Sequence, residues 1–415
     1  KKKKLAMRWI FFILFFGVLE WYAFQAIKAS TNQRIWWWLY LSIATFLLIN
    51  LFIGLLQFDR SRGFSTYETY SFGLFFAMAV FQLMVGGMLL LEDLIRGMKG
   101  LINIVSQTTT SDNLYLPKRR AFISQLAIAL GMIPSGALIY GMLKGKYNYQ
   151  VLRYTLTYDD LPQSFDGYQI TQISDIHSGS FDNAEKVQYG IDLINQQESD
   201  IILFTGDLVN NIAKEMRPWQ NQFSTLSARH GVFSVLGNHD YGDYYQWPSE
   251  QDKVDNMNQL STLQKEMGWT LLRNEHHFIQ RGKERLALLG VENWGTGFKR
   301  AGDLEKTLEN VEEKDFKILM SHDPSHWEAQ VLPHAFPIHL TLSGHTHGMQ
   351  FGIEIPGWIK WSPVKWRYKQ WAGVYEQGQQ KINVNRGFGF LAYPGRFGMW
   401  PEISVITLRR SKTAV

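Results

Sequence analysis

The first 145 residues differ sharply from the rest in the distribution of their apolar residues. Four long segments are almost entirely apolar, and Glu20 is the one charged residue among them; they span 9–27, 35–56, 70–91 and 121–143. Each is about long enough for a helix that crosses the ~30 Å hydrocarbon core of a bilayer, which takes roughly 20 residues. The pattern predicts an all-α region of four transmembrane helices over residues 1–145.

A different pattern begins near residue 150. Short apolar runs end in polar clusters at 168–174, 201–205, 232–236, 316–320, 339–342 and 381–384. Helix-like stretches lie between several of them, as at 183–197 and 253–267. Buried strands that alternate with helices favour a layered α/β domain, which we expect over residues 150–411.

Composition supports this division of the chain. Residues 1–153 carry 17 Lys/Arg against 6 Asp/Glu, whereas the rest carries 25 against 31, and all eleven histidines lie in the second part. This asymmetry excludes a single soluble domain and a disordered chain. The acidic second part offers no basic face for nucleic acid. Because the chain has no cysteine, it has no disulfides, thiolate metal sites or cysteine nucleophile.

Glu20 lies within the first apolar segment, where an ionisable group is costly. It either makes a polar contact inside the helix bundle or reaches the membrane surface because the helix sits shallow. We favour the second interpretation.

The orientation in the membrane is weakly determined. Four spans put both ends on one side, and the positive residues divide ten against seven, or six against seven without Lys1–Lys4, so the positive-inside rule does not decide. Arg119 and Arg120 precede an apolar run and resemble a twin-arginine export signal. We therefore lean towards an extracytoplasmic second domain on a multi-pass cell-membrane protein, although such a pair is also common as an anchor.

Five of the apolar runs end in side chains that can bind metals or move protons. These side chains are Asp175 and His177, then Asp207, then Asn238, His239 and Asp240, then His322, and finally His345 and His347. In an extended chain residues i and i+2 face the same way, so Asp175 and His177 can face one ion. Neighbouring glycines permit the tight turns that present such side chains.

In this order the five motifs resemble those of the calcineurin-like metallophosphoesterases, over roughly residues 150–409. The resemblance implies a β-sandwich flanked by helices and two divalent metal ions bridged by Asp207. It assigns the remaining ligands of one ion to Asp175, His177 and His347, and those of the other to Asn238, His322 and His345. Imidazole, carboxylate and amide ligands without sulfur suit Mn, Fe or Zn.

The same resemblance implies the chemistry. Two metal ions lower the pKa of water towards neutrality and offset the charge on phosphate oxygens. His239 is expected to contact a phosphoryl oxygen or the leaving group, as an acid or hydrogen-bond donor, with Asp240 orienting its ring.

Two further segments have open alternatives. The glycine-rich segment 383–397 is similar to one near the active site in a membrane-anchored bacterial branch of the family. In this chain, either Arg386 or Arg396 holds a second phosphate, or both are ordinary surface arginines. The segment 357–371 has four tryptophans, four basic residues and no acid. Trp358 and Trp361 belong to a flap that contacts the bilayer and a lipid substrate, or else to a loop packed on the protein.

These observations predict a membrane-bound dimetal phosphohydrolase that cleaves a phosphoester or pyrophosphate bond. The expected partners are membrane lipids and a lipid-linked phosphate substrate, and the resemblance suggests UDP-diacylglucosamine as one candidate. A tethered phosphodiesterase for a soluble substrate is the first alternative, and a non-catalytic metal-binding membrane sensor is the second. The sequence does not predict the oligomeric state.

Overall fold

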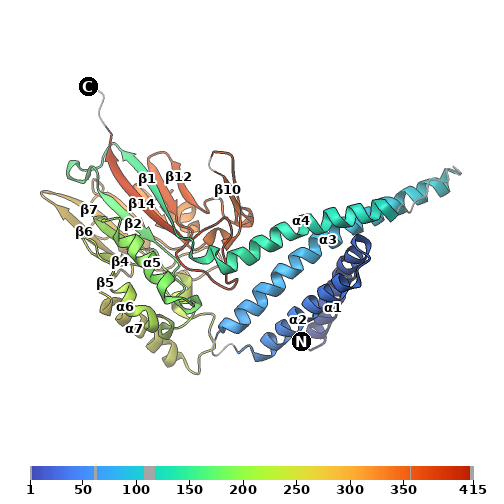
Figure 1. The fold of residues 1–415 in the computed structure, drawn as a ribbon. Coiled ribbons are helices and arrows are strands. Elements are labelled where there is room, and N and C mark those ends of the chain that lie inside the picture. Colours follow the sequence, from blue (N-terminus) through green and yellow to red (C-terminus); the bar gives the residue numbers. More distant parts are fainter. Residues whose placement is uncertain (1, 60–62, 107–116, 356, 412–415) are drawn as a thin grey trace. The chain divides into compact units, whose positions relative to one another are not determined.

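A computed structural model describes residues 2–59, 63–106, 117–355 and 357–411. The chain separates into two compact units (Figure 1), one of residues 1–58 with 67–140 and one of residues 59–66 with 141–415.

The first unit is built from long helices, whose bounds are α1 (Lys2–Ser30), α2 (Arg34–Gln57), α3 (Thr66–Val105) and α4 (Pro117–Leu143). In the described chain, four helices are long and apolar enough to cross a membrane, as predicted. Helix α3 continues to Val105, well beyond the end of its apolar segment at residue 91. The charged residues that follow, such as Glu92, end the apolar segment but not the helix. Small and apolar side chains such as Ala23, Val85 and Ala127 form the buried core of this unit.

Glu20 makes its contacts inside the helix bundle, so the expectation that it reaches the membrane surface is wrong. Its Oε2 accepts hydrogen bonds from the Tyr40 hydroxyl of α2, at 3.0 Å, and from the Gln82 amide of α3. Hydrogen bonds to partners on neighbouring helices stabilise polar groups in hydrocarbon, which explains why the three side chains converge.

The arginine pair also has partners within this unit. Arg120 binds both Glu92 and Asp93 of α3, with 2.9 Å between its Nη1 and Asp93 Oδ1. Arg119 lies 3.8 Å from Glu92. These ion pairs join α3 to α4, while the side of the membrane stays a prediction.

The second unit contains two six-stranded sheets. The first has the order β1-β14-β2-β3-β4-β5, and the second has the order β12-β13-β9-β8-β7-β6. The strands of the first are β1 (Gln150–Tyr158), β2 (Gln169–Ile173), β3 (Ile201–Phe204), β4 (Val232–Ser234), β5 (Trp269–Leu271) and β14 (Glu402–Arg410). Those of the second are β6 (Glu275–Arg281), β7 (Glu284–Gly290), β8 (Phe316–Met320), β9 (Leu340–Ser343), β12 (Gly373–Gln377) and β13 (Gln380–Val384).

Three apolar cores hold these layers together. One core joins the facing sides of the two sheets, with Ile170 and Leu203 from the first packed in the same cluster as Leu288 and Ile318 from the second. The outer face of the first sheet is covered by α5 (Ala184–Asn195), α6 (Gln220–Phe223) and α7 (Glu250–Glu266). The outer face of the second is covered by α8 (Leu304–Thr307) and the turn η6 (Trp327–Val331). The predicted β-sandwich flanked by helices is confirmed.

Parallel pairing places the candidate residues. Strand β2 pairs in parallel with β3, and β3 with β4, while β8 pairs in parallel with β9. The carboxyl ends of parallel strands meet at one edge of a sheet. The motifs that follow these five strands are therefore brought together. A separate hairpin of β10 (Ile353–Ile355) and β11 (Ile359–Trp361), with the turn η8 (Pro363–Trp366), follows the last motif.

Candidate metal centre

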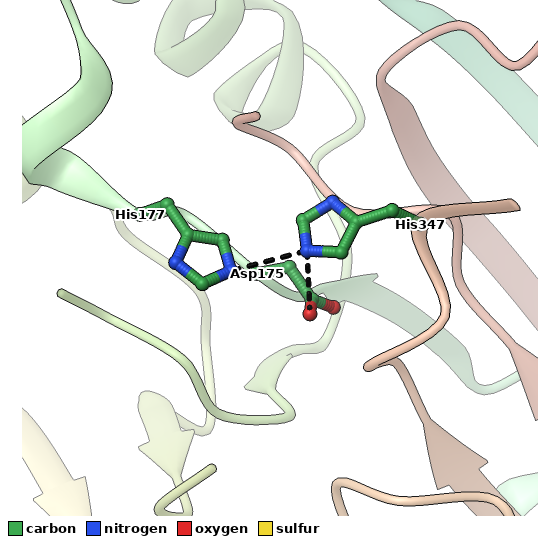
Figure 2. A group of neighbouring side chains, drawn as sticks. All are labelled: Asp175, His177 and His347. Atoms are coloured by element: carbon green, nitrogen blue, oxygen red, sulfur yellow. Dashed lines mark hydrogen bonds and ion pairs between the residues drawn. The ribbon is translucent and has the colours of Figure 1, made fainter. Parts of the chain in front are cut away.

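The first group of candidate ligands consists of Asp175 and His177, which follow β2, and His347, which follows β9. Figure 2 shows the three side chains converging, with 3.0 Å between the Nε2 atoms of the histidines. His347 Nε2 also lies 3.2 Å from Asp175 Oδ1 (Figure 2). All three residues are buried, and their ligand atoms lie within 4.8 Å of one another. This donor set can hold one divalent ion.

The second group consists of Asp207, His322 and His345, which follow β3, β8 and β9. Asp207 Oδ2 lies 3.2 Å from His322 Nε2, and His345 Nδ1 lies 3.3 Å from the same nitrogen. Asp207 Oδ2 is also 3.5 Å from His177 Nε2 in the first group. One carboxylate oxygen thus faces both groups, which fits the bridging role that the family resemblance implies for Asp207.

Asn238 supports the same interpretation. Its side-chain amide nitrogen donates to the Tyr244 hydroxyl at 3.0 Å, whereas its buried Oδ1 has no hydrogen-bond partner among the described residues. A buried oxygen without a donor is costly unless a cation takes its lone pair. His322 donates from Nδ1 to the carbonyl of Thr205 at 2.8 Å, which leaves Nε2 for an ion. The residues present therefore fit divalent metal ions.

The backbone is strained at this centre. Five of the candidate ligands have positive φ angles between 47° and 69°, namely Asp175, His177, Asp207, His345 and His347. Such conformations cost on the order of 1–3 kcal/mol each and persist only where the surroundings enforce them. Part of the enforcement is close packing, because a Cβ on Gly344 would lie 2.2 Å from Asp175 Oδ2 and one on Gly237 would lie 2.2 Å from Asp207 Oδ1. Only glycine fits at these two positions.

The buried carboxylates and imidazoles shift each other's pKa values. Burial raises the pKa of Asp175, but the charge of His347 outweighs this effect and holds the pKa below its usual range. Burial lowers the pKa of His322, yet the Asp207 carboxylate raises it overall to about 10. Burial lowers the pKa of His345 to about 4, so this imidazole is neutral near pH 7. Buried carboxylates that attract positive charge in this way are suited to a divalent cation.

His239 lies at this centre, but its ring is not oriented by Asp240 as expected. The Asp240 carboxylate accepts hydrogen bonds from the backbone N–H groups of Asp207, Leu208, Val209 and Gly237, at 2.8 to 3.3 Å. The ring of His239 instead uses Nδ1 to contact the carbonyl of Asn210 at 2.7 Å. The oxygens of Asp240 are occupied by backbone N–H groups of the two turns that carry Asp207 and Asn238. Asp240 therefore shapes these turns.

Neither arginine of the glycine-rich segment is available for a phosphate, which corrects the assignment of Arg386 and Arg396 to substrate binding. Arg386 is buried and forms ion pairs with Glu402 and with both oxygens of Glu354, at 2.7 Å each. Arg396 is fully buried and directs its N–H groups to backbone carbonyls and to His347 Nδ1. Both guanidinium groups are thus bound by groups of the protein itself.

A cavity of about 500 Å³ opens onto both ligand groups. Its described lining includes Trp366 but neither Trp358 nor Trp361. Trp358 is 75% exposed on the β10–β11 hairpin, and Trp361 packs against Trp366 with 6.1 Å between ring centroids. The segment 357–371 thus reaches the cavity through Pro363, Val364, Trp366, Arg367 and Tyr368, and the two tryptophans expected to bind substrate are outside this lining.

The site also contains residues that the sequence interpretation missed. The Tyr368 hydroxyl forms a hydrogen bond with His345 Nε2 at 2.9 Å, and Asp323 Oδ2 lies 3.5 Å from the same nitrogen. Phe298 packs edge-on against His345. Asp323 directly follows a motif histidine, which is a usable signal, whereas Phe298 lies in a loop with no motif.

Comparison with known proteins identifies the chain. Residues 168–349 match the family model of calcineurin-like phosphoesterases. This part of the chain is a calcineurin-like metallophosphoesterase domain. In addition, residues 7–146 of this metallophosphoesterase match a model described as a probable calcineurin-like phosphoesterase transmembrane domain. The predicted enzyme class, a metal-dependent phosphoesterase, and the presence of a membrane region are thereby confirmed.

The relatives have the same domain. The chain is 29% identical over 303 residues to the uncharacterized metallophosphoesterase YkuE of Bacillus subtilis, covering 70% of this chain and 97% of that protein. It is 26% identical to a transmembrane protein with metallophosphoesterase domain of Danio rerio, covering 69% of this chain and 63% of that protein. Among solved structures, the phosphopantetheinyl hydrolase of Mycobacterium tuberculosis matches 53% of this chain and 89% of that one at 13% identity, with a TM-score of 0.33, too low to bear on function.

Proposed function

We propose that the chain hydrolyses a phosphoester or pyrophosphate bond at the candidate metal centre, with two divalent ions (Mn, Fe or Zn) held by the two ligand groups. The observation that carries this proposal is the position of Asp207, whose Oδ2 faces His177 and His322 from the two groups. Asp175 and His347 complete the first group, and Asn238 and His345 the second. Bound divalent ions supply a nucleophile from water near neutral pH and offset phosphate charge.

His239 is the proposed proton donor. It lines the cavity, and its Nδ1 is engaged with the carbonyl of Asn210. Since a carbonyl only accepts, Nδ1 carries a proton, and Nε2 remains for a substrate oxygen. When a second proton occupies Nε2, His239 can donate that proton or a hydrogen bond to the leaving group as the bond breaks.

The proposed substrate is lipid-linked, and the rim of the cavity supports this choice. Met349 and Trp366 line the cavity and are 57% and 75% exposed, and Trp358 is exposed on the adjoining hairpin. Exposed basic side chains, Lys365 and Arg367, accompany them. Exposed aromatic and aliphatic side chains beside basic residues suit the headgroup layer of an anionic bilayer. UDP-diacylglucosamine, which combines a pyrophosphate with acyl chains, is the candidate for a site that faces the cytoplasm, and other lipid-linked phosphates are the candidates for a site outside.

The substrate proposal is tested by replacing Trp358, Trp361 and Trp366 with serine in the full chain. We expect hydrolysis of a soluble phosphodiester with added Mn to be unchanged, and hydrolysis of UDP-diacylglucosamine in mixed micelles to fall about tenfold. Tyr189→Ser, which changes an exposed aromatic residue on α5, is the matched control. Equal loss on both substrates contradicts the flap, and wild-type activity restricted to soluble esters favours the tethered phosphodiesterase. No turnover of any ester with Mn, Fe or Zn favours the non-catalytic sensor.

The side of the membrane is a separate part of the proposal. We keep the extracytoplasmic location, for which Arg119 and Arg120 are the sequence argument. Because the chain has no cysteine, Ser411→Cys introduces a single thiol next to β14. Labelling by a membrane-impermeant maleimide in intact cells, with the outer membrane permeabilised where there is one, supports that location and disfavours cytoplasmic nucleotide-linked lipids. Labelling only after lysis places the site in the cytoplasm.

A further inference from the structure

We propose that Glu215 positions His239 through the peptide group that joins Asn210 to Asn211. This inference rests on the proposed function, because it concerns the residue to which proton donation is assigned. Glu215 lies in the turn η4 (Ala213–Trp219), outside all five sequence motifs. It touches neither a candidate ligand side chain nor His239 directly in the contacts of the described chain. Its effect is transmitted by hydrogen bonds.

The hydrogen bonds form a continuous chain. Glu215 Oε2 accepts the N–H of Asn211 at 3.3 Å, and the carbonyl of the same peptide group, that of Asn210, accepts His239 Nδ1–H at 2.7 Å. The same carboxylate oxygen accepts the N–H of Asn210 at 2.6 Å. One peptide group thus has a carboxylate at its N–H end and the imidazole of His239 at its C=O end.

This arrangement has an electrostatic consequence. A carboxylate next to a peptide N–H polarises the peptide and makes its carbonyl oxygen a stronger acceptor. The stronger acceptor holds the proton on Nδ1 of His239 and fixes the orientation of the ring. In a catalytic triad a carboxylate does this by direct contact with histidine. Here the carboxylate closest in sequence, Asp240, is occupied by backbone amides, and Glu215 acts through a peptide instead.

The carboxylate of Glu215 is held firmly in this position. It also accepts the N–H of Ile212 at 3.4 Å, so both of its oxygens are bound by the loop that precedes η4. On its other side a Cβ on Gly179 would lie 2.5 Å from Glu215 Oε2, which shows how closely the turn η3 (Ser178–Ser180) packs on it. The side chain has little freedom to leave the Asn210–Asn211 peptide.

The test uses the full chain with Mn at pH 8 and two soluble phosphodiesters, one with a nitrophenol leaving group and one with an alkanol. An alkanol depends more on proton donation, since its alkoxide is the poorer leaving group. Glu215→Gln should lower kcat roughly tenfold for the alkyl ester and less than threefold for the nitrophenyl ester. KM and the content of bound metal should not change. Glu266→Gln, a change of an acid on α7 that binds Gln220, is the matched control and should leave both rates unchanged.

A double-mutant cycle separates positioning from a structural role. In a His239→Asn background, Glu215→Gln should cause no additional loss, because the residue it positions is absent. Equal losses on both esters, additive losses in the two backgrounds, loss of metal, or full activity would each overturn the proposal. If Glu215→Gln does not fold, Glu215→Asp, which keeps the charge but retracts it, should give the same selective loss. Absence of turnover in the wild type would instead refute the proposed function.

Discussion

Arg396 Nη2 donates a hydrogen bond to Nδ1 of His347 over 2.9 Å, while Nε2 of the same ring faces Asp175 at 3.2 Å. The remaining N–H groups of this fully buried guanidinium are bound by the backbone carbonyls of Arg386, Gly389 and Met399. A planar fork with every donor used has one orientation, so it fixes the ring of His347 with that ring's own proton on Nε2, and an ion that binds Nε2 must displace this proton. The arginine expected to hold a phosphate instead holds a candidate metal ligand.

Replacing Arg396 should therefore weaken metal binding. A lysine at this position supplies a single ammonium group and cannot satisfy His347 and three carbonyls together. We expect Arg396→Lys to reduce the affinity of one of the two bound ions by roughly 10- to 100-fold. Metal titration of the full chain measures this, with Arg409→Lys, at a half-exposed position on β14, as the control. Two ions bound with unchanged affinity would show that His347 does not depend on this contact.

Replacing His239 should separate metal binding from turnover. His239 belongs to neither ligand group, so His239→Asn should leave two ions bound. Loss of general acid catalysis should lower kcat by about 100-fold or more. Elemental analysis and a phosphodiesterase assay on the same sample provide the two measurements. Normal turnover would remove His239 from the mechanism.

Removing metal should destabilise the C-terminal unit. Without a cation, the buried carboxylates of Asp175 and Asp207 and the unpaired Oδ1 of Asn238 lose their compensation. Free metal at about 100 times its Kd stabilises the folded state by roughly 2.7 kcal/mol. Thermal unfolding should thus shift to higher temperature with Mn and to lower temperature with EDTA. Asp207→Asn should respond far less to either addition, and an unchanged response in this variant would argue against Asp207 as a ligand.

Glu215 should make stability depend on pH in the neutral range. Burial raises the pKa of its carboxyl from 4.5 to about 7, against the effect of the backbone amides. The folded state therefore holds this proton more tightly than the unfolded state does. The stabilisation it provides is complete below pH 4.5 and is lost as the pH rises through about 7. Relative to Glu215→Gln, which does not titrate, the unfolding temperature of the wild type should fall across this window; a constant difference would contradict the shift.

The pattern of apolar runs predicted the elements that carry the site. The runs at 201–205 and 316–320 became β3 and β8, each within a residue of its expected bounds. Strands β1 and β14 were not predicted. Their alternating and charged residues give a weaker signal than a continuous apolar run, and their pairing depends on partners far away in the sequence.

The candidate ligands could be predicted because they lie in short motifs at strand ends, and the resemblance of these motifs to a known family assigned them to two ions. The roles of Arg386 and Asp240 could not, because these depend on long-range or backbone partners. Arg386 faces Glu354 and Glu402, which lie 32 and 16 residues away, and no local pattern shows that these charges meet. Asp240 lies next to His239 in sequence, yet its oxygens bind backbone amides that any residue type supplies. Trp366 rather than Trp361 reaches the cavity because η8 turns the chain between them.

The position of β14 has a consequence for the order in which the protein is made. This strand lies between β1 and β2 in the first sheet, pairing in parallel with the former and antiparallel with the latter. During synthesis, β1 emerges directly after the apolar helices but has no neighbour until Glu402–Arg410 has left the ribosome. Until then β1 presents an unpaired edge, the kind of exposed strand that favours wrong associations. We expect truncation before β14 to leave a nascent chain that a protease cleaves between α4 and β2, whereas the full-length chain is protected there.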